Sequence, residues 1–354
     1  GLGLVEMLLR LQEPYFHLMG ARAESTLERY APHRVWHHWL RPHNTVGVQS
    51  FNDKLWPRPM IWKTNAQGCR YGRDLSRRPP KGARRIIVMG DSFTEGYYQD
   101  SGIAATLERR LYQAGGPILH EVINCGTSSY SPVLYYLRYK HHLSKFHPDE
   151  LIVNIDLTDV YDDNVRYGPN LRYAAGGEPI EALPTARGLN RMVTSLKYRF
   201  HFARLIFGNP ARLVAPTRDE IFAYHSRLTP DSARWQRAVG VSLGHLQRLI
   251  DLTRSQGVEL TLTMYPYLIQ VVGPASGPPW HRGFENEVRK LAERNGIAFY
   301  SAYDDILPHV KRGEPVYWVN DFHFTPTGQD LWSSVFADYY MNRKRSSGHE
   351  QTAE

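Results

Sequence analysis

The feature that most constrains the fold is a regular alternation of short apolar runs and amphipathic segments that begins near residue 85. The first run, Ile86-Ile87-Val88-Met89, is continuous and ends at a glycine. Such runs are typical of strands buried on both faces of a parallel sheet. The next segment spaces Ile103, Leu107 and Leu111 at i, i+4 and i+8, which predicts a helix.

The alternation continues almost to the C-terminus. Further strands are predicted at 121–124, 151–155, 260–265 and 297–300, and further helices from residue 132 to about 143 and over 232–256, 284–294 and 327–340. Strands alternate with helices in this way when a parallel sheet is covered on both faces. The sequence therefore predicts an α/β fold, a three-layer α/β/α sandwich around a parallel five-stranded sheet. Ligands of such sheets bind at the carboxyl ends of the strands.

Three segments depart from this alternation. Residues 1–84 are rich in Trp, His, Arg and Pro, and we expect an extension that wraps the main domain of residues 85–342. Residues 164–216 carry many Gly, Pro and Arg and are predicted to form an insertion or lid, with some helix around 196–206. Residues 343–354 are polar and are predicted to be a disordered tail.

The apolar N-terminal stretch, residues 1–11, is shorter than the about 20 residues that a membrane-spanning helix needs. It is interpreted either as an amphipathic helix packed on the domain or as the remnant of a membrane anchor or signal, and we favour the remnant. That interpretation predicts membrane association and a place in the cell envelope.

Charge and composition limit the classes of partner that the chain is expected to bind. The chain has 43 Lys and Arg against 35 Asp and Glu, a net charge of +8, which favours anionic partners. The basic residues are scattered and no nucleic-acid motif accompanies them, so we expect no nucleic-acid binding. The histidine pairs at 37–38 and 141–142 lack metal-ligand spacing, and we expect no metal and no cofactor. Cys69 and Cys125 could form one disulfide in an oxidising compartment, although the sequence does not require it.

A candidate nucleophile follows the first predicted strand. Gly90-Asp91-Ser92 lies between this strand and the next helix, where a serine hydroxyl is exposed at the edge of the sheet. The backbone N–H of Ser92 can join a pocket for an oxyanion there.

A candidate base lies 231 residues further on, before the last helix. His323 is preceded by Asp321, and a carboxylate at this spacing can hold the imidazole in the tautomer that accepts the serine proton. Asn320 stands three positions before the histidine and Asp321 two before it, and we assign the orienting role to Asp321. Only the fold can bring this pair to Ser92.

With these residues, the chain resembles the SGNH/GDSL hydrolase superfamily in its bacterial, envelope-associated branch. The resemblance covers about residues 60–340 and includes a lead-in segment at 64–70, a first block at 86–96, a second at 122–130, a third at 157–160 and the last around His323. It implies a flavodoxin-like sandwich, the catalytic set Ser92, Asp321 and His323, and no cofactor. The Asp-x-His spacing is similar to that of polysaccharide O-acetyltransferases within this superfamily.

The same resemblance implies an oxyanion hole that departs from the family pattern. Its donors would be the N–H groups of Ser92 and of Gly126 or Ser129, together with Thr158. The family's second-block glycine aligns with Ser129, and its third-block asparagine with Thr158. Threonine donates from a shorter side chain, and the loss of one such donor costs on the order of 3 kcal/mol in the transition state. Asn154 is a possible substitute.

Three further residues are candidates for contacting the substrate: Asp91, Asp159 and His281. Asp159 belongs to an acidic cluster with Asp156, Asp162 and Asp163, which is interpreted mainly as a solvated loop with helix caps. His281 is expected in a proline-rich loop after the fourth strand, where loops of this architecture line the cleft.

These features predict a serine-dependent esterase or O-acyltransferase acting on an acylated small molecule, glycan or lipid of the cell envelope. The alternative is a catalytically weak glycan-binding module of the same fold in an envelope polysaccharide assembly.

Overall fold

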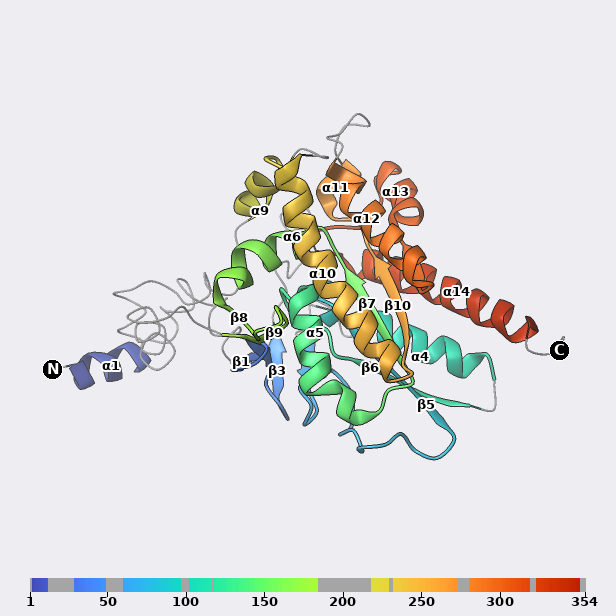
Figure 1. Cartoon of the computed structure of the whole chain (residues 1–354). Coiled ribbons are helices and arrows are strands. Elements are labelled where there is room, and N and C mark those ends of the chain that lie inside the picture. The colour runs from blue at the N-terminus through green and yellow to red at the C-terminus, as the bar shows by residue number, and fades with distance from the viewer. Residues whose placement is uncertain are drawn as a thin grey trace.

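The computed structural model confirms a single parallel sheet at the centre of the chain (Figure 1). It describes residues 2–11, 29–48, 60–96, 102–115, 118–183, 218–228, 232–272, 280–318 and 323–350. The sheet contains β5 (Ala83–Met89), β6 (Leu119–Asn124), β7 (Glu150–Ile155), β10 (Glu259–Met264) and β11 (Ala298–Ser301). Their spatial order is β11-β10-β7-β5-β6, and every neighbouring pair is parallel. The predicted strands are thus confirmed, with ends that differ by at most three residues.

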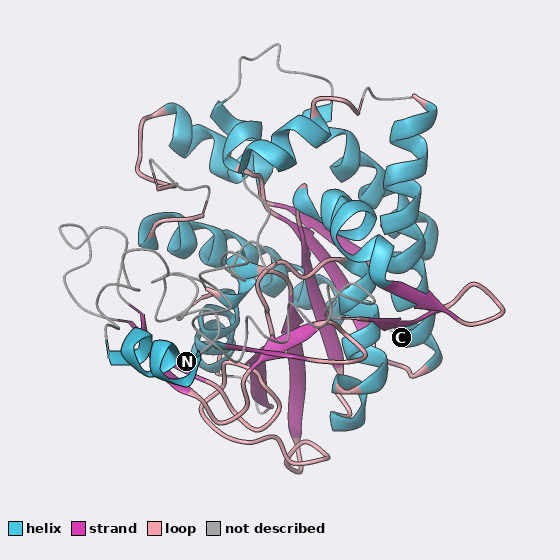
Figure 2. Ribbon diagram, turned by 90° about the vertical axis from the view of Figure 1, so that its left-hand side faces the viewer, coloured by secondary structure: helices cyan, strands magenta, loops and turns pink. Residues whose placement is uncertain are grey.

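Helices cover both faces of this sheet, which Figure 2 shows between them. One face packs against α5 (Pro132–His141), α10 (Ala233–Ser255) and α12 (Trp280–Asn295). The other packs against α4 (Ile103–Gln113), α13 (Tyr303–Lys311) and α14 (Pro326–Glu350). The apolar runs of the strands supply both cores, so Ile87 and Met89 face one layer while Ile86 and Val88 face the other.

The remaining helical elements are short. They are α1 (Leu2–Leu11), α3 (Ser92–Glu95), the 3₁₀ turn η1 (Leu143–Phe146), α6 (Thr158–Tyr161), the π-helical turn η2 (Asp162–Tyr167), the 3₁₀ turn η3 (Gly168–Asn170), α9 (Arg218–His225) and α11 (Leu268–Val272). Within the described ranges, no helix combines the length and the apolar character that crossing a bilayer requires.

The N-terminal extension forms two small antiparallel sheets, β1 (Tyr30–Pro32) with β2 (His38–Leu40) and β3 (Thr45–Val48) with β4 (Met60–Lys63). Part of the predicted insertion meets it, because β8 (Leu171–Tyr173) and β9 (Pro179–Ala182) form a third hairpin there. The Ala182 N–H donates to the Val35 carbonyl at 2.7 Å and its carbonyl accepts from His37 N–H at 2.8 Å. The helix predicted around 196–206 lies outside the described residues.

A disulfide joins Cys69 to Cys125 and closes a stretch of 56 residues. It ties the N-terminal extension to the residue that directly follows β6. The disulfide that the sequence permits but does not require is therefore present in the structure.

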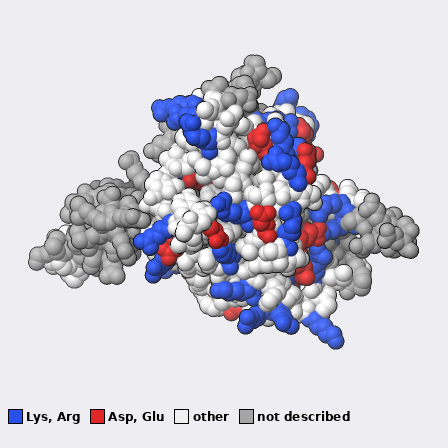
Figure 3. Space-filling view, in the orientation of Figure 1, with Lys and Arg blue, Asp and Glu red and all other residues white. Residues whose placement is uncertain are grey.

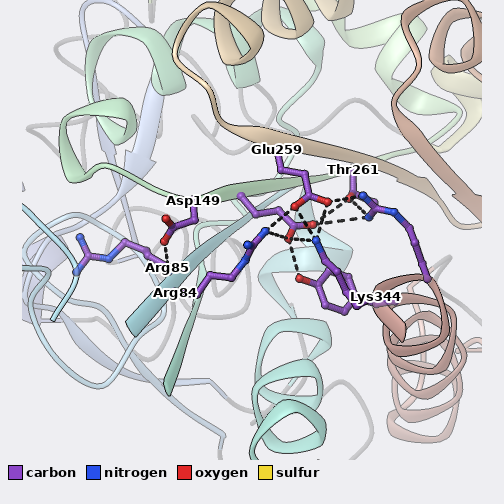
Figure 4. A network of polar contacts seen from close by, with 9 residues as sticks. Arg84, Arg85, Asp149, Glu259, Thr261 and Lys344 are labelled. Carbon is purple, nitrogen blue, oxygen red and sulfur yellow. Dashed lines mark hydrogen bonds and ion pairs between the residues drawn. The ribbon is translucent and has the colours of Figure 1, made fainter. Parts of the chain in front are cut away.

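The predicted disordered tail is wrong for residues 343–350, because α14 continues through Glu350. Lys344 of this helix belongs to a charged network at the amino ends of the strands (Figure 4). Lys344 Nζ lies 3.1 Å from the fully buried Glu150 and 2.6 Å from Glu259. Arg343 bonds Glu259 as well, and Arg84 bonds both carboxylates. The helix stays ordered because its cations balance carboxylates at the edge of the sheet.

On the face seen in Figure 3, Lys and Arg lie in several separate groups, some of them beside Asp and Glu, and form no single patch.

Candidate active site

The turn after β5 presents Ser92 at the carboxyl edge of the sheet. Asp91 caps α3, since its Oδ1 accepts a hydrogen bond from Phe93 N–H at 3.0 Å. Ser92 is the first residue of α3, where no preceding turn supplies an acceptor for its N–H. Position 90 has room only for a glycine, because a Cβ there would lie 2.0 Å from Thr94 Oγ1. The close packing of this turn fixes the direction of the serine hydroxyl.

His323 meets this serine across the whole fold. Its Nε2 lies 2.8 Å from Ser92 Oγ, and its ring packs on Phe93 with 4.9 Å between ring centroids. His323 stands three positions before α14, so the docking of that helix places the imidazole. The structure thus brings the predicted nucleophile and base together. Asp321 lies outside the described residues, and its orienting role stays a prediction.

The N–H of Gly126, one of the two candidates for the second oxyanion donor, makes a hydrogen bond within its own turn. Its N–H donates to Asn124 Oδ1 at 3.0 Å, within the turn that follows β6. Its own role is steric, because a Cβ at this position would lie 2.4 Å from the Glu95 nitrogen. The loop after β6 can therefore pack directly on the backbone of α3.

Ser129 stands where the alignment puts the family's glycine, and its backbone explains that preference. Its φ is +59°, in the left-handed region that glycine adopts without strain. The Ser129 carbonyl accepts a hydrogen bond from the Tyr167 hydroxyl at 2.5 Å, which holds the residue in this conformation. The role of the Ser129 N–H as the second backbone donor stays a prediction.

Thr158 also departs from the expectation. Its N–H and its hydroxyl both donate to Asp156 Oδ1, each at 2.7 Å. The single hydroxyl proton is thereby directed to a carboxylate and not to an oxyanion. The suggested substitute, Asn154, donates to Thr94 Oγ1 at 2.8 Å and supports the nucleophile turn instead.

The acidic cluster after β7 is buried, which corrects its interpretation as a solvated loop. Asp156, Asp159, Asp162 and Asp163 are each at most 2% exposed. Burial, followed by the charge of Asp156, raises the pKa of Asp159 well above its usual range. Burial likewise raises the pKa of Asp162 to about 7, against the opposing effect of Arg166. Within the described ranges, no three or more His, Cys, Asp or Glu side chains are arranged to hold a metal ion.

Tyr265 links this cluster to the nucleophile turn, and the sequence did not single it out. Its hydroxyl lies 2.7 Å from Asp91 Oδ1 and 2.6 Å from Asp156 Oδ2. Asp91 Oδ2 in turn lies 3.2 Å from Ser92 Oγ. Burial, and next the charge of Asp156, raise the pKa of Asp91 well above its usual range. A tyrosine at the carboxyl end of a predicted strand was the signal that could have identified it.

The N-terminal extension also reaches the site. The Tyr30 hydroxyl lies 2.7 Å from Glu95 Oε1, and Glu95 Oε2 accepts from Ser128 N–H at 2.5 Å. His38 Nε2 donates to the Ser128 carbonyl at 2.8 Å. Residues 30–38 therefore hold both the end of α3 and the loop that carries Ser129.

The expected position of His281 is corrected as well. Helix α12 begins at Trp280, so His281 belongs to a helix and not to the proline-rich loop. Its side chain lies outside the described residues.

Comparisons with solved structures give distant similarities. An acetylxylan esterase from Geobacillus stearothermophilus is 16% identical, with a TM-score of 0.44, 72% of this chain covered and 93% of that one. An acetyl xylan esterase of unstated source is 14% identical, with a TM-score of 0.43 and coverage of 73% and 98%. An α/β hydrolase from the metagenome of Lake Arreo, Spain, is 14% identical, with a TM-score of 0.43 and coverage of 72% and 94%. No curated protein matches the chain.

A family model, by contrast, matches most of the chain. The match extends over residues 88–331, from within β5 to α14, and so includes both Ser92 and His323. The model describes the GDSL-like Lipase/Acylhydrolase family. The chain belongs to this family of acyl-ester hydrolases.

Proposed function

We propose that the chain is a serine-dependent esterase or O-acyltransferase that uses Ser92 as its nucleophile. The observation that carries the proposal is the 2.8 Å contact between Ser92 Oγ and His323 Nε2. A base at this distance can take the hydroxyl proton as the serine attacks a carbonyl carbon.

The reaction follows in two balanced steps. Ser92 Oγ bonds to the acyl carbon, its proton passes to His323, and the alcohol leaves with that proton. Water or a sugar hydroxyl then attacks the acyl-serine and gives its proton to His323. The bond to Ser92 Oγ breaks, and Ser92 regains a proton. Asp321 is proposed to orient the imidazole, and the N–H groups of Ser92 and Ser129 to bind the oxyanion.

Hydrolysis of p-nitrophenyl acetate tests this proposal. Ser92→Ala is expected to lower kcat by on the order of 10³-fold or more, because the covalent route is lost. Ser255→Ala changes an exposed serine at the end of α10 and serves as the matched control. Turnover in Ser92→Ala equal to that of the wild type would exclude the nucleophile role. Labelling of Ser92 by a fluorophosphonate gives an independent readout.

A second candidate function is a weak or inactive module that binds glycans. It is favoured by one observation, namely that two of the expected oxyanion donors, Gly126 and Thr158, are engaged in other hydrogen bonds. The two candidates differ in a simple assay. A binding module would retain glycan in a pull-down with wild type and Ser92→Ala alike, and would show no turnover that depends on Ser92.

We further propose that the substrate is an acylated glycan or lipid of the cell envelope. The Cys69–Cys125 disulfide supports a place outside the cytosol, since such bonds persist in oxidising compartments. Mass spectrometry can monitor acetyl transfer from an acylated donor to an added oligosaccharide. Such transfer distinguishes a transferase from an esterase. Fractionation of the source cells, with alkylation of free thiols, tests the compartment.

A further inference from the structure

We propose that Asp91, Tyr265 and Asp156 hold one shared proton beside the nucleophile, and that Asp91 is the neutral carboxyl that leaves the Ser92 hydroxyl directed at His323. Asp91 is thereby a positioning residue, and its effect on turnover rests on the function proposed above. The protonation state of the trio can be measured independently of turnover.

The number of hydrogens in the trio requires the extra proton. The Tyr265 hydroxyl is in short contact with two carboxyl oxygens, 2.7 Å from Asp91 and 2.6 Å from Asp156. A tyrosine hydroxyl has one hydrogen and can donate to only one of them. The other contact is a hydrogen bond only if that carboxyl is protonated and donates to the tyrosine oxygen. Without this proton, two oxygens that carry lone pairs would face each other in a buried site.

The hydrogen bonds to each carboxyl indicate where the proton resides. Asp156 Oδ1 accepts two short bonds from Thr158, at 2.7 Å each, and bonds to an ionised carboxylate favour its charge. Asp91 accepts one backbone bond, from Phe93 at 3.0 Å. The negative charge is therefore held on Asp156, with Tyr265 donating to it, and the proton is held on Asp91.

The groups packed around the trio are mainly carboxyl and phenol groups, which do not stabilise a second negative charge there. Asp159 of α6 accepts a 3.4 Å contact from Asp156 N–H, and Tyr135 of α5 lies 3.4 Å from Asp159. Asp162 and Asp163 follow in η2, and His323 faces the trio across Ser92. Among the described residues, no ion pair reaches Asp91, Asp156 or Asp159, and the Arg166 guanidinium pairs with Asp162 instead.

This protonation state affects the nucleophile because the Ser92 hydroxyl has one proton and two acceptors in reach. These are His323 Nε2 at 2.8 Å and Asp91 Oδ2 at 3.2 Å. An ionised Asp91 would compete for the proton, since hydrogen bonds to a carboxylate are stronger than those to a neutral acceptor. A neutral Asp91 leaves the proton to the base.

Infrared difference spectroscopy tests the shared proton in the full chain. A protonated carboxylic acid has a carbonyl stretch that an ionised carboxylate lacks. We expect this band at neutral pH in the wild type and its loss in both Asp91→Asn and Asp156→Asn. Asp338→Asn, which changes an exposed carboxylate of α14, should leave the band in place. A band as strong in Asp91→Asn as in the wild type would overturn the proposal, whether or not the chain hydrolyses esters.

Kinetics test the positioning role. In Asp156→Asn the new amide donates to Tyr265, which turns its hydroxyl to Asp91 and favours the ionised form of that residue. We expect kcat to fall about tenfold, the effect of one misdirected hydrogen bond, with KM little changed. The double variant Asp91→Asn/Asp156→Asn cannot place a charge beside Ser92 and should recover to within about threefold of Asp91→Asn. If the double variant is instead as slow as the two single effects combined, Asp91 and Asp156 act independently and the positioning role is wrong. Absence of any turnover in the wild type would refute the proposed function, while the infrared band would still decide the proton.

Discussion

Ser92 Oγ and His323 Nε2 are 2.8 Å apart although 231 positions separate them in the chain. Ser92 starts the helix after β5, and His323 precedes α14, which packs against α4. Changes that displace a strand end, the loop after β6 or α14 are therefore expected to alter activity without touching either residue.

The buried histidines predict a loss of stability on acidification. Burial lowers the pKa of His38 to about 3 and that of His225 to about 4, from the ordinary value of 6.5. Between these values the unfolded chain binds more protons than the folded one, so the free energy of unfolding falls as the pH drops from 6.5 towards 4. At pH 5, each of these two histidines should lower the free energy of unfolding by about 2 kcal/mol.

Urea unfolding at pH 7 and pH 5 measures this loss. His38→Gln cannot titrate and should reduce the difference between the two pH values by about 2 kcal/mol. His147→Asn changes an exposed histidine in the left-handed region, which asparagine tolerates, and should not alter the difference. Equal pH dependence in all three proteins would contradict the assignment to buried histidines.

Removal of the disulfide is expected to destabilise the chain and to weaken the active site. For a closed stretch of 56 residues, the loss of the constraint on the unfolded chain amounts to about 4 kcal/mol. Cys125 directly precedes Gly126, so Cys69→Ser/Cys125→Ser should also lower kcat for p-nitrophenyl acetate. Thermal unfolding with and without reductant checks the first effect. A double variant as stable as the oxidised wild type would contradict it.

Gly126→Ala should separate the loop after β6 from α3. The added Cβ would lie 2.4 Å from the Glu95 nitrogen, which is backbone and cannot turn away. We expect a loss of about 1–3 kcal/mol in stability and a marked fall in kcat. Gly176→Ala is the matched control, because a methyl group added there would meet nothing within 4 Å. Similar melting temperatures for the two variants would mean that the loop can retreat without cost.

Truncation after Asn342 should destabilise the fold, because it removes Arg343 and Lys344. Glu150 is fully buried and would keep Arg84 alone as its cation. A partly uncompensated buried carboxylate is expected to cost about 2 kcal/mol in the free energy of unfolding. Truncation after Ser346 keeps both cations and serves as the control. If both truncated chains unfold at the same urea concentration, the network does not stabilise the sheet edge.

The local features of the chain were sufficient to predict the frame of the fold. The run at residues 86–89 and its later counterparts identified all five strands, because buried parallel strands are continuously apolar. Ser92 and His323 could be predicted because each lies in a short segment next to a predicted strand or helix.

Contacts between distant segments could not be predicted. Asp156 and Tyr265 lie 109 positions apart, and an acidic loop has the same sequence pattern whether it is solvated or buried. Lys344 looks like part of a polar tail until its partner Glu259, 85 positions earlier, is placed beside it. The direction of the Gly126 N–H, which donates to Asn124 Oδ1, depends on backbone angles that the residue types do not determine.

The family match begins at residue 88, yet Tyr30, His38 and Cys69 all brace the loop and helix that form the active site. The site is thus assembled partly from residues that precede the range matched by the family model. Residues that precede the matched range can therefore influence the selectivity of the site. A chimaera joined at the start of β5 would receive Ser92 and His323 from one parent, but the residues that hold the loop after β6 from the other.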